Sequence, residues 1–197
     1  MRNEDYYGIV LAGGTSSRMG TDKAAIRLNG RTFLEIQVEK LKNLGLGRVL
    51  VSCPYSGPTN DADLIPDIMY VPDLLPERGP LGGLYSCFLR CEGHPAIVLS
   101  VDVPRISAAT LRALMTAYDR EKVDGVVLLY NDRPEPLLAV YNTGTREVIK
   151  ELLDMGELPV LSYLASINCC RFPFKGDPEE LINCNTPEEL RMLKSVK

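Results

Sequence analysis

Apolar residues along this chain form two kinds of pattern, short continuous runs and runs with the spacing of one helix face. The continuous runs predict strands at 6–11, 48–52, 68–71, 96–101, 125–129 and 137–141. Helical spacing predicts helices at 33–44, 81–91 and 146–153, and a further helix that begins after Ser107. Because strands and helices alternate, the pattern predicts an α/β fold with a mostly parallel sheet.

Polar residues at the ends of the apolar runs support these boundaries. Thr32 and Glu35 form a capping-box pattern in front of the first long helix. Thr186 and Glu189 repeat that pattern near the C-terminus, where a proline follows the threonine. Residues 53–67 are rich in Pro, Gly, Asn and Asp, which predicts irregular surface structure.

The first predicted strand leads directly into Leu11-Ala-Gly-Gly-Thr-Ser-Ser-Arg-Met-Gly-Thr-Asp-Lys23. Gly13 and Gly14 can adopt backbone angles that other residues avoid, and successive backbone N–H groups there can form a concave anion site. Arg18 and Lys23 add positive charge, so the segment is predicted to bind the phosphates of a nucleoside triphosphate. The alternative is a flexible surface loop, because clusters of Gly and Ser are common in loops. The segment matches neither the Walker A loop nor the Gly-x-Gly-x-x-Gly dinucleotide fingerprint.

Two aspartates follow other predicted strands, Asp73 after 68–71 and Asp102 after 96–101. Ligands of open α/β sheets bind outside the carboxyl ends of the strands, so we expect both aspartates to gather with the glycine-rich segment. Magnesium takes one or two carboxylates together with phosphate oxygens and waters, which makes Asp102 a candidate Mg²⁺ ligand. The alternative for each aspartate is a structural role in the turn after its strand. His94, the single histidine, precedes its strand and is expected at the opposite edge, outside the site.

Composition narrows the classes of protein further. A chain of 197 residues with 45% hydrophobic residues fits one domain with a sizeable core. The net charge of −4 offers no general basic field to nucleic acid or an anionic membrane surface. No apolar run approaches the roughly 18 residues of a membrane span and no signal peptide is evident, so we expect a cytoplasmic protein. The six cysteines include no Cys-x-x-Cys pair and are expected to be small buried apolar residues.

The segment from Leu11 to Lys23 resembles the signature of nucleotidyltransferases with a glycosyltransferase-A-like fold. Within them it is most similar to the molybdenum cofactor guanylyltransferases, which join GMP from GTP to molybdopterin and release pyrophosphate. The resemblance implies a single Rossmann-like three-layer α/β domain over residues 1–197, with Mg²⁺ as cofactor. It implies catalytic roles for Arg18, Lys23 and Asp102, with Asp102 as the metal ligand. The nucleotide-binding residues that it implies are Leu11, Ala12, Gly13, Gly14, Lys23, Ser52, Asp73 and Asp102.

Three later segments extend the resemblance. A Gly-Pro-Leu-Gly-Gly segment ends in Gly82 and Gly83, which would let a ribose or base approach the backbone. A Glu-Pro-Leu segment that begins at Glu135 resembles one that faces the acceptor substrate in the family. Asn183 and Asn185 lie in an Asn-x-Asn-Thr-Pro motif, which makes them candidates for a place near the metal. The same motif also fits an ordinary helix start.

The residue types leave several alternatives open. Ser52 stands where some family members have an asparagine near the nucleotide. Ala12-Gly-Gly favours guanylyl transfer over cytidylyl transfer, whose enzymes typically have Ala-Ala-Gly, and sugar-phosphate nucleotidyltransferases with this fold are usually longer. A non-catalytic nucleotide-binding or scaffold domain is the alternative of another class, although Lys23 and Asp102 are both present. We expect a monomer that has no nucleic-acid or membrane partner. Transient contacts with other proteins of cofactor biosynthesis stay open.

Overall fold

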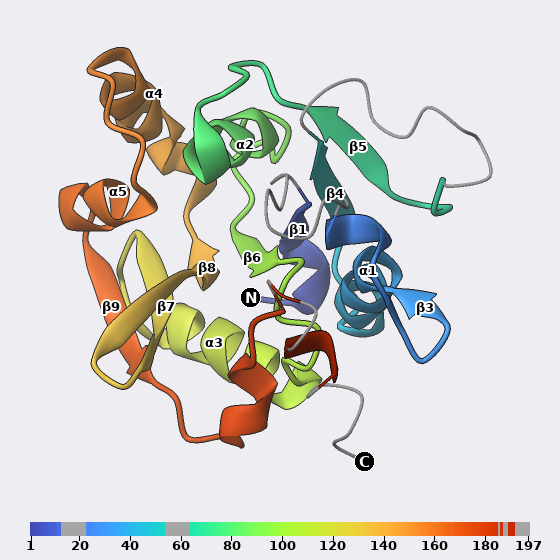
Figure 1. Ribbon diagram of the computed structural model, residues 1–197. Helices are drawn as coiled ribbons and strands as arrows, with labels where there is room; N and C mark the ends of the chain where they lie inside the picture. The colour runs from blue at the N-terminus through green and yellow to red at the C-terminus, as the bar shows by residue number, and fades with distance from the viewer. Residues whose placement is uncertain (13–22, 54–63, 185, 187–188, 192–197) are drawn as a thin grey trace.

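The computed structural model describes residues 1–12, 23–53, 64–184, 186 and 189–191 (Figure 1). The strands are β1 (Tyr7–Leu11), β2 (Arg27–Leu28), β3 (Arg31–Thr32), β4 (Arg48–Cys53), β5 (Met69–Pro72), β6 (Ala96–Ser100), β7 (Gly125–Tyr130), β8 (Arg133–Tyr141) and β9 (Cys169–Pro173). The α-helices are α1 (Phe33–Asn43), α2 (Gly79–Phe88), α3 (Ala108–Arg120), α4 (Arg146–Asp154) and α5 (Val160–Ser166). Short 3₁₀ helices are η1 (Asn3–Asp5), η2 (Lys23–Ala25), η4 (Thr143–Thr145) and η5 (Pro178–Leu181).

Seven strands form one sheet in the order β5-β4-β1-β6-β8-β7-β9, and β2 and β3 form a separate small hairpin. The pairs β5/β4, β4/β1, β1/β6 and β7/β9 are parallel, whereas β8 is antiparallel to both β6 and β7. The sheet is therefore mostly parallel, which confirms the predicted fold class.

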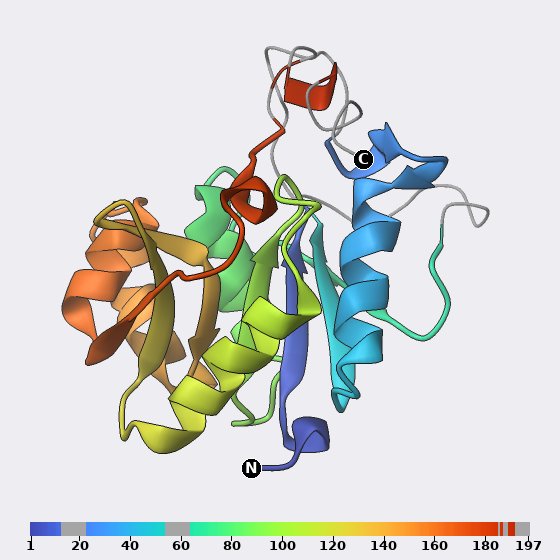
Figure 2. The same ribbon diagram turned by 90° about the horizontal axis from the view of Figure 1, so that it is seen from below.

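Helices cover both faces of this sheet, so the fold has three layers (Figures 1 and 2). The inner faces of α1 and α3 pack in one hydrophobic core, and those of α2, α4 and α5 pack in a second core across the sheet. Every residue of β1 is buried, because its side chains point alternately into the two cores.

Two of the predicted caps are present in full. The Thr32 hydroxyl accepts a hydrogen bond from the Glu35 N–H at 3.1 Å, and the Glu35 carboxylate accepts one from the Thr32 N–H at 2.6 Å. These hydrogen bonds hold the pKa of Glu35 below its ordinary value. The same reciprocal pair joins Thr186 and Glu189, at 2.9 and 3.2 Å. Local chemistry thus fixes the start of α1, and the same pair of hydrogen bonds is present at Thr186 and Glu189.

The structure corrects the sequence prediction around β8. This strand begins at Arg133, four residues before the predicted start at 137, and it pairs with β7 through a hairpin turn. The turn residues Asn131 and Asp132 both have positive φ, 48° and 59°. Pro134 and Pro136 hid the strand, since proline lacks the N–H that a central strand needs. They are tolerated because β6 pairs only with the later part of β8, from Leu138 onward.

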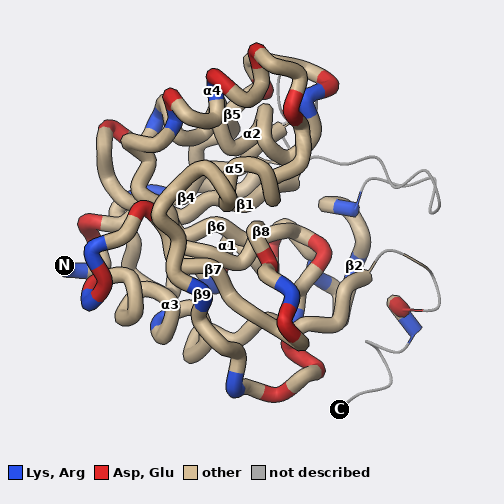
Figure 3. Tube along the Cα trace, turned by 90° about the vertical axis from the view of Figure 1, so that its left-hand side faces the viewer, with Lys and Arg blue, Asp and Glu red and all other residues tan. Residues whose placement is uncertain are grey.

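Four of the six cysteines are buried as expected, and two are only partly so. The six cysteines all lie in the described residues and none forms a disulfide; Cys53, Cys87, Cys91 and Cys184 are buried, while Cys169 and Cys170 are half-buried. Charged residues lie mainly on loops and outer helix faces, and β1 and β6 carry none (Figure 3). Among the described helices, none has both the length and the apolar character that a membrane crossing requires.

Candidate functional site

The strands β4, β1 and β6 end side by side, and their register places two predicted residues, Leu11 and Ser52, next to each other. Leu11 at the end of β1 lies opposite Ser52 on one side and Ser100 on the other. The Asp73 N–H, just past β5, donates to the carbonyl of Cys53 at 2.8 Å. The carboxyl ends of four parallel strands therefore form one edge of the sheet, which is uppermost in Figure 2. We call this the carboxyl edge.

Asp102 lies in the turn that follows β6 at this edge. The Val101 N–H donates to the Leu11 carbonyl at 3.3 Å, which continues the pairing of β6 with β1. The Ser100 hydroxyl donates to Oδ1 of Asp102 at 2.5 Å, and Lys23 Nζ lies 3.3 Å from Oδ2. Both oxygens of the carboxylate thus have a partner in the protein.

Lys23 reaches Asp102 from η2, 79 residues earlier in the chain. The side chains are 18% and 21% exposed, so the ion pair is partly shielded from water but open on one side. Charges in such a setting interact more strongly than on an open surface. The prediction that Lys23 and Asp102 lie at one site is met by this contact.

Asp73 lies at the same edge and is held by its neighbours. Its Oδ1 accepts hydrogen bonds from the Leu75 N–H at 3.0 Å and from the Ser86 hydroxyl at 3.3 Å. Burial raises the pKa of Asp73 above its ordinary value, and these hydrogen bonds oppose the rise. The side chain is half-buried, so it is still accessible from solvent.

The glycines of α2 lie close to other atoms of the protein. A Cβ on Gly83 would stand 2.5 Å from the Ser52 hydroxyl, and one on Gly82 would stand 3.0 Å from the Leu75 carbonyl. The atoms that approach these glycines are the protein's own, so the missing side chains let α2 pack closely on β4 and on the segment after β5. In the described residues, Gly82 and Gly83 are buried.

The C-terminal segment touches the main chain of Asp102. The Cys184 N–H donates to the Asp102 carbonyl at 2.9 Å, and the Cys184 side chain is fully buried. The neighbouring Asn183 is exposed. The segment that carries the motif thus reaches the Asp102 turn through the backbone of Cys184, which lies between the two asparagines.

Several predicted site residues lie outside the described residues, namely Gly13, Gly14, Arg18 and Asn185. Ala12, the last described residue before them, is buried.

Glu135 on β8 also belongs to this end of the sheet. Burial raises the pKa of its carboxyl group, and the negative charge of Asp102 adds to the rise. In the β6/β8 register, Leu99 pairs with Leu138. Asp102 lies three residues after Leu99, and Glu135 lies three residues before Leu138. A second carboxylate thus stands in the electrostatic field of the first.

Two residues of α1 that the sequence interpretation missed also reach the Asp102 turn. Gln37 Nε2 donates to the carbonyls of Ser100 and Val103, and Lys40 Nζ donates to the carbonyl of Pro104. The sequence did contain a sign of Gln37, because it is a polar residue among the apolar residues that form the buried face of α1.

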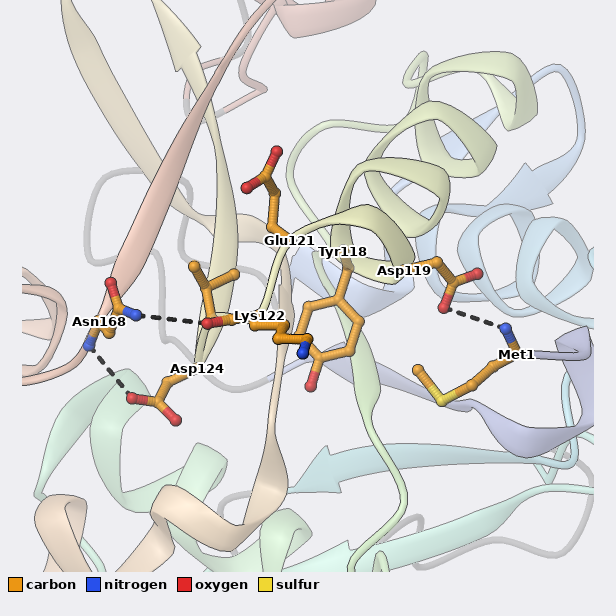
Figure 4. Close-up of a pocket in the computed structure, with 8 residues that line it drawn as sticks. Met1, Tyr118, Asp119, Glu121, Lys122, Asp124 and Asn168 are labelled. Atoms are coloured by element: carbon orange, nitrogen blue, oxygen red, sulfur yellow. Dashed lines mark hydrogen bonds and ion pairs between the residues drawn. The ribbon is translucent and has the colours of Figure 1, made fainter.

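The opposite edge of the sheet holds His94 and a surface hollow. Nδ1 of His94 lies 3.0 Å from the Asp5 carbonyl, and the ring stacks on Tyr7 beside the start of β1. This confirms the prediction that His94 lies away from the site. The hollow, of about 390 Å³, is lined by Met1, Asn168 and six residues from 118–124 (Figure 4). We call this opposite edge of the sheet the amino edge.

The donor set of the carboxyl edge can be tested against a divalent cation. In the described part of the chain, no group of three or more His, Cys, Asp or Glu side chains gathers around one point. A closed protein cage for a metal is therefore absent there. One rigid carboxylate beside a lysine fits magnesium better, because this ion usually takes few protein ligands and shares phosphate oxygens with the substrate.

An α/β sheet that gathers a lysine and carboxylates at its carboxyl edge has the arrangement of a class of nucleotide-binding proteins. The sequence profile of the MobA-like NTP transferase domain matches residues 8–167, and the chain belongs to this family of nucleotidyltransferases.

Individual relatives agree with this assignment. The chain is 34% identical to the probable molybdenum cofactor guanylyltransferase of Methanothermobacter thermautotrophicus, over 93% of this chain and 96% of the relative. It is 32% identical to the molybdenum cofactor guanylyltransferase of Xanthomonas euvesicatoria, over 92% and 90%. The crystal structure of molybdopterin-guanine dinucleotide biosynthesis protein A from Archaeoglobus fulgidus superposes with a TM-score of 0.82 at 23% identity, over 95% of this chain and 96% of that one.

Proposed function

We propose that the protein transfers GMP from GTP to molybdopterin and releases pyrophosphate. The observation that carries the proposal is the contact between Lys23 and Asp102 at the carboxyl edge, in a chain of this family. The relatives of 34% and 32% identity are named for the same reaction and match nearly the whole chain. Their names supply the acceptor and the base.

The reaction joins two phosphates without a covalent enzyme intermediate. An oxygen of the acceptor's terminal phosphate attacks the α-phosphorus of GTP, the new P–O bond forms, and the bond to the β-phosphate oxygen breaks with its electrons leaving on pyrophosphate. The nucleophile is already anionic at neutral pH, so no general base is required. Catalysis then rests on positioning and on charge stabilisation.

The protein's own residues supply both. Lys23 would neutralise charge on the triphosphate as it builds up on the leaving group. Arg18 is assigned the same kind of role from its place in the motif. Asp73 and Ser52, at the ends of neighbouring strands, line the same edge and would contact the nucleoside.

Asp102 is the proposed ligand of Mg²⁺. Its carboxylate is fixed by Ser100 and stands in front of Lys23, and Glu135 adds negative charge from β8. A divalent cation bound there would neutralise phosphate oxygens and the departing pyrophosphate.

The test is pyrophosphate release with GTP, CTP, ATP and UTP, each with and without Mg²⁺ and molybdopterin. The proposal predicts release with GTP that needs both additions and is lost in Asp102→Ala. Release with CTP would assign cytidylyl transfer by the same site. Nucleotide binding without turnover would instead support a non-catalytic domain.

A further inference from the structure

Helix α1 carries an amide in the middle of its buried face. Gln37 lies one helical turn from Phe33 and from Leu41, and all three side chains are fully buried. An amide buried among apolar groups is costly unless its donors and acceptor are satisfied. The contacts of Gln37 therefore indicate what its polar group does.

The two donors of Gln37 hold the main chain on both sides of Asp102. Nε2 donates to the Ser100 carbonyl at 2.8 Å and to the Val103 carbonyl at 3.0 Å. A carboxamide nitrogen has two hydrogens, so these bonds use its whole donor capacity. One side chain thus spans the turn that presents the Asp102 carboxylate.

Lys40 determines which end of the amide faces this turn. Its Nζ donates to Oε1 of Gln37 at 3.1 Å and also donates to the Pro104 carbonyl. With Oε1 occupied by an ammonium donor, Nε2 is the end that points to the carbonyls. Burial lowers the pKa of Lys40 to about 8, while the nearby Glu180 opposes that decrease.

The Asp102 turn is otherwise held by contacts of other kinds. The Cys184 N–H reaches the Asp102 carbonyl, and the Ser100 hydroxyl reaches the Asp102 carboxylate. Both act on Asp102 itself, and the Val101 N–H holds the start of the turn to β1, whereas Gln37 binds carbonyls on both sides of Asp102. Loss of the Gln37 bonds would leave the local chain free to rotate the carboxylate away from its place.

We infer that Gln37, oriented by Lys40, is a positioning residue that sets the Asp102 carboxylate for cation and triphosphate binding. The inference rests on the proposed function only for what Asp102 binds. The placement of the turn by Gln37 is a separate claim that can be measured without substrate.

The experiment compares Gln37→Met with Thr143→Val. Methionine keeps the length and helix preference of glutamine but cannot donate to the carbonyls. Thr143 is the matched control, since its fully buried hydroxyl also donates to a backbone carbonyl, that of His94, at 2.8 Å. That contact lies at the amino edge. Lys40→Met serves as a second variant with a milder change if Gln37→Met does not fold.

Two measurements are made on each protein. Hydrogen–deuterium exchange of the backbone amides within residues 101–106, where every residue except Pro104 has one, reports the turn directly. Binding of Mn²⁺ in the presence of GTP, followed by the electron paramagnetic resonance of the free ion, reports the cation site. Loss of a residue that orients a metal ligand typically weakens metal binding about 10- to 100-fold. We expect that weakening and faster exchange at 101–106 for Gln37→Met, a smaller effect of the same kind for Lys40→Met, and neither for Thr143→Val.

The outcomes separate the two proposals. Unchanged exchange at 101–106 in Gln37→Met would show that Gln37 is an ordinary buried polar residue and would overturn the inference. Equal weakening of Mn²⁺ binding in Thr143→Val would also overturn it, because general destabilisation would then explain the loss. If the unaltered protein binds no Mn²⁺ with GTP, the proposed function fails, and exchange alone decides the role of Gln37.

Discussion

The two edges of the central sheet differ in where their polar groups come from. At the carboxyl edge, Lys23 and Asp102 are 79 residues apart in the chain and meet at 3.3 Å, and Asp73 joins from a third segment. At the amino edge, six of the eight residues that line the hollow come from one stretch, 118–124. The hollow is a defined cavity, yet in the described residues the parallel strands bring a lysine and aspartates from distant segments together at the other edge.

At the amino edge, the carboxylates of Asp119 and Asp124 have partners within the protein. The Tyr6 hydroxyl donates to Asp119 at 2.6 Å, and the amino group of Met1 lies 3.3 Å from the same carboxylate. Asn168 donates its backbone N–H to Asp124 at 3.2 Å (Figure 4). These contacts hold Met1 against Asp119 and hold Asn168 against Asp124. They do not place opposite charges around a space for a phosphate chain.

The first prediction sets one aspartate at each edge against the other. We expect Asp102→Asn to lower kcat for pyrophosphate release about 10³-fold, because it removes the charge proposed to hold the cation. Asp119→Asn should leave kcat within about twofold while it lowers the melting temperature, since Tyr6 and Met1 lose their charged partner. A similar loss of kcat in both variants would show that the contrast between the edges is wrong.

The second prediction compares one lysine at each edge of the sheet. Lys23→Met removes the positive charge opposite Asp102 and should lower kcat/KM for GTP about 10²-fold. Lys122, which lines the hollow, is the matched control, and Lys122→Met should change kcat/KM by less than about twofold. Steady-state kinetics at saturating Mg²⁺ would measure both. An equal loss at the two positions would indicate a long-range effect of net charge, which added salt would screen.

The third prediction concerns packing beneath the carboxyl edge. Alanine is usually a better helix residue than glycine, yet Gly83→Ala would bring a Cβ to 2.5 Å from the Ser52 hydroxyl. We expect a loss of about 1 to 3 kcal/mol in the free energy of unfolding by urea. Adding Ser52→Ala should restore most of that loss, since the remaining contacts of the Cβ are 3.3 Å or longer. Failure of the double variant to recover would show that the backbone, not the serine, limits the space.

The sequence was sufficient for this edge where each strand is a continuous apolar run ended by a polar signal. Asp102 after 96–101 and Asp73 after 68–71 are of this kind, and β6 and β5 each end within one residue of the predicted end. The sequence did not show β8 in full because Pro134 and Pro136 resemble a loop, and they are tolerated only where β6 no longer pairs with the strand. It also did not show α5 and β9, which are short and lack a clear apolar period.

The role of Gln37 shows a second limit. Periodicity alone places residue 37 on the inner face of α1, but the carbonyls that it meets belong to a turn more than 60 residues later. Such long-range partners of a buried polar group appear only when the fold is known. The same applies to Gly83, whose close neighbour is a serine on another strand.

The last prediction contrasts the response of the two edges to alkaline pH. Burial lowers the pKa of Lys40, beside the Asp102 turn, to about 8, whereas burial and Asp119 raise the pKa of Tyr6 near the amino edge. Between pH 8 and the ordinary lysine value, the unfolded chain holds a proton on Lys40 that the folded chain has lost, so stability due to Lys40 rises with pH. Above about pH 10, the unfolded chain loses the Tyr6 proton that the folded chain keeps, so stability due to Tyr6 falls.

Matched variants separate the pH dependence of stability due to Lys40 from that due to Tyr6. The free energy of unfolding of the unaltered protein minus that of Lys40→Met should increase by about 1 to 2 kcal/mol between pH 8 and 9.5, because all other groups cancel in the difference. The corresponding difference for Tyr6→Phe should stay flat over that range and decrease above about pH 10. Urea denaturation at closely spaced pH values would measure both. If the difference in the free energy of unfolding for Lys40→Met did not change with pH, the Lys40 ammonium would be as well solvated as one on the surface. Lys40 would then not be the buried donor that orients the Gln37 amide.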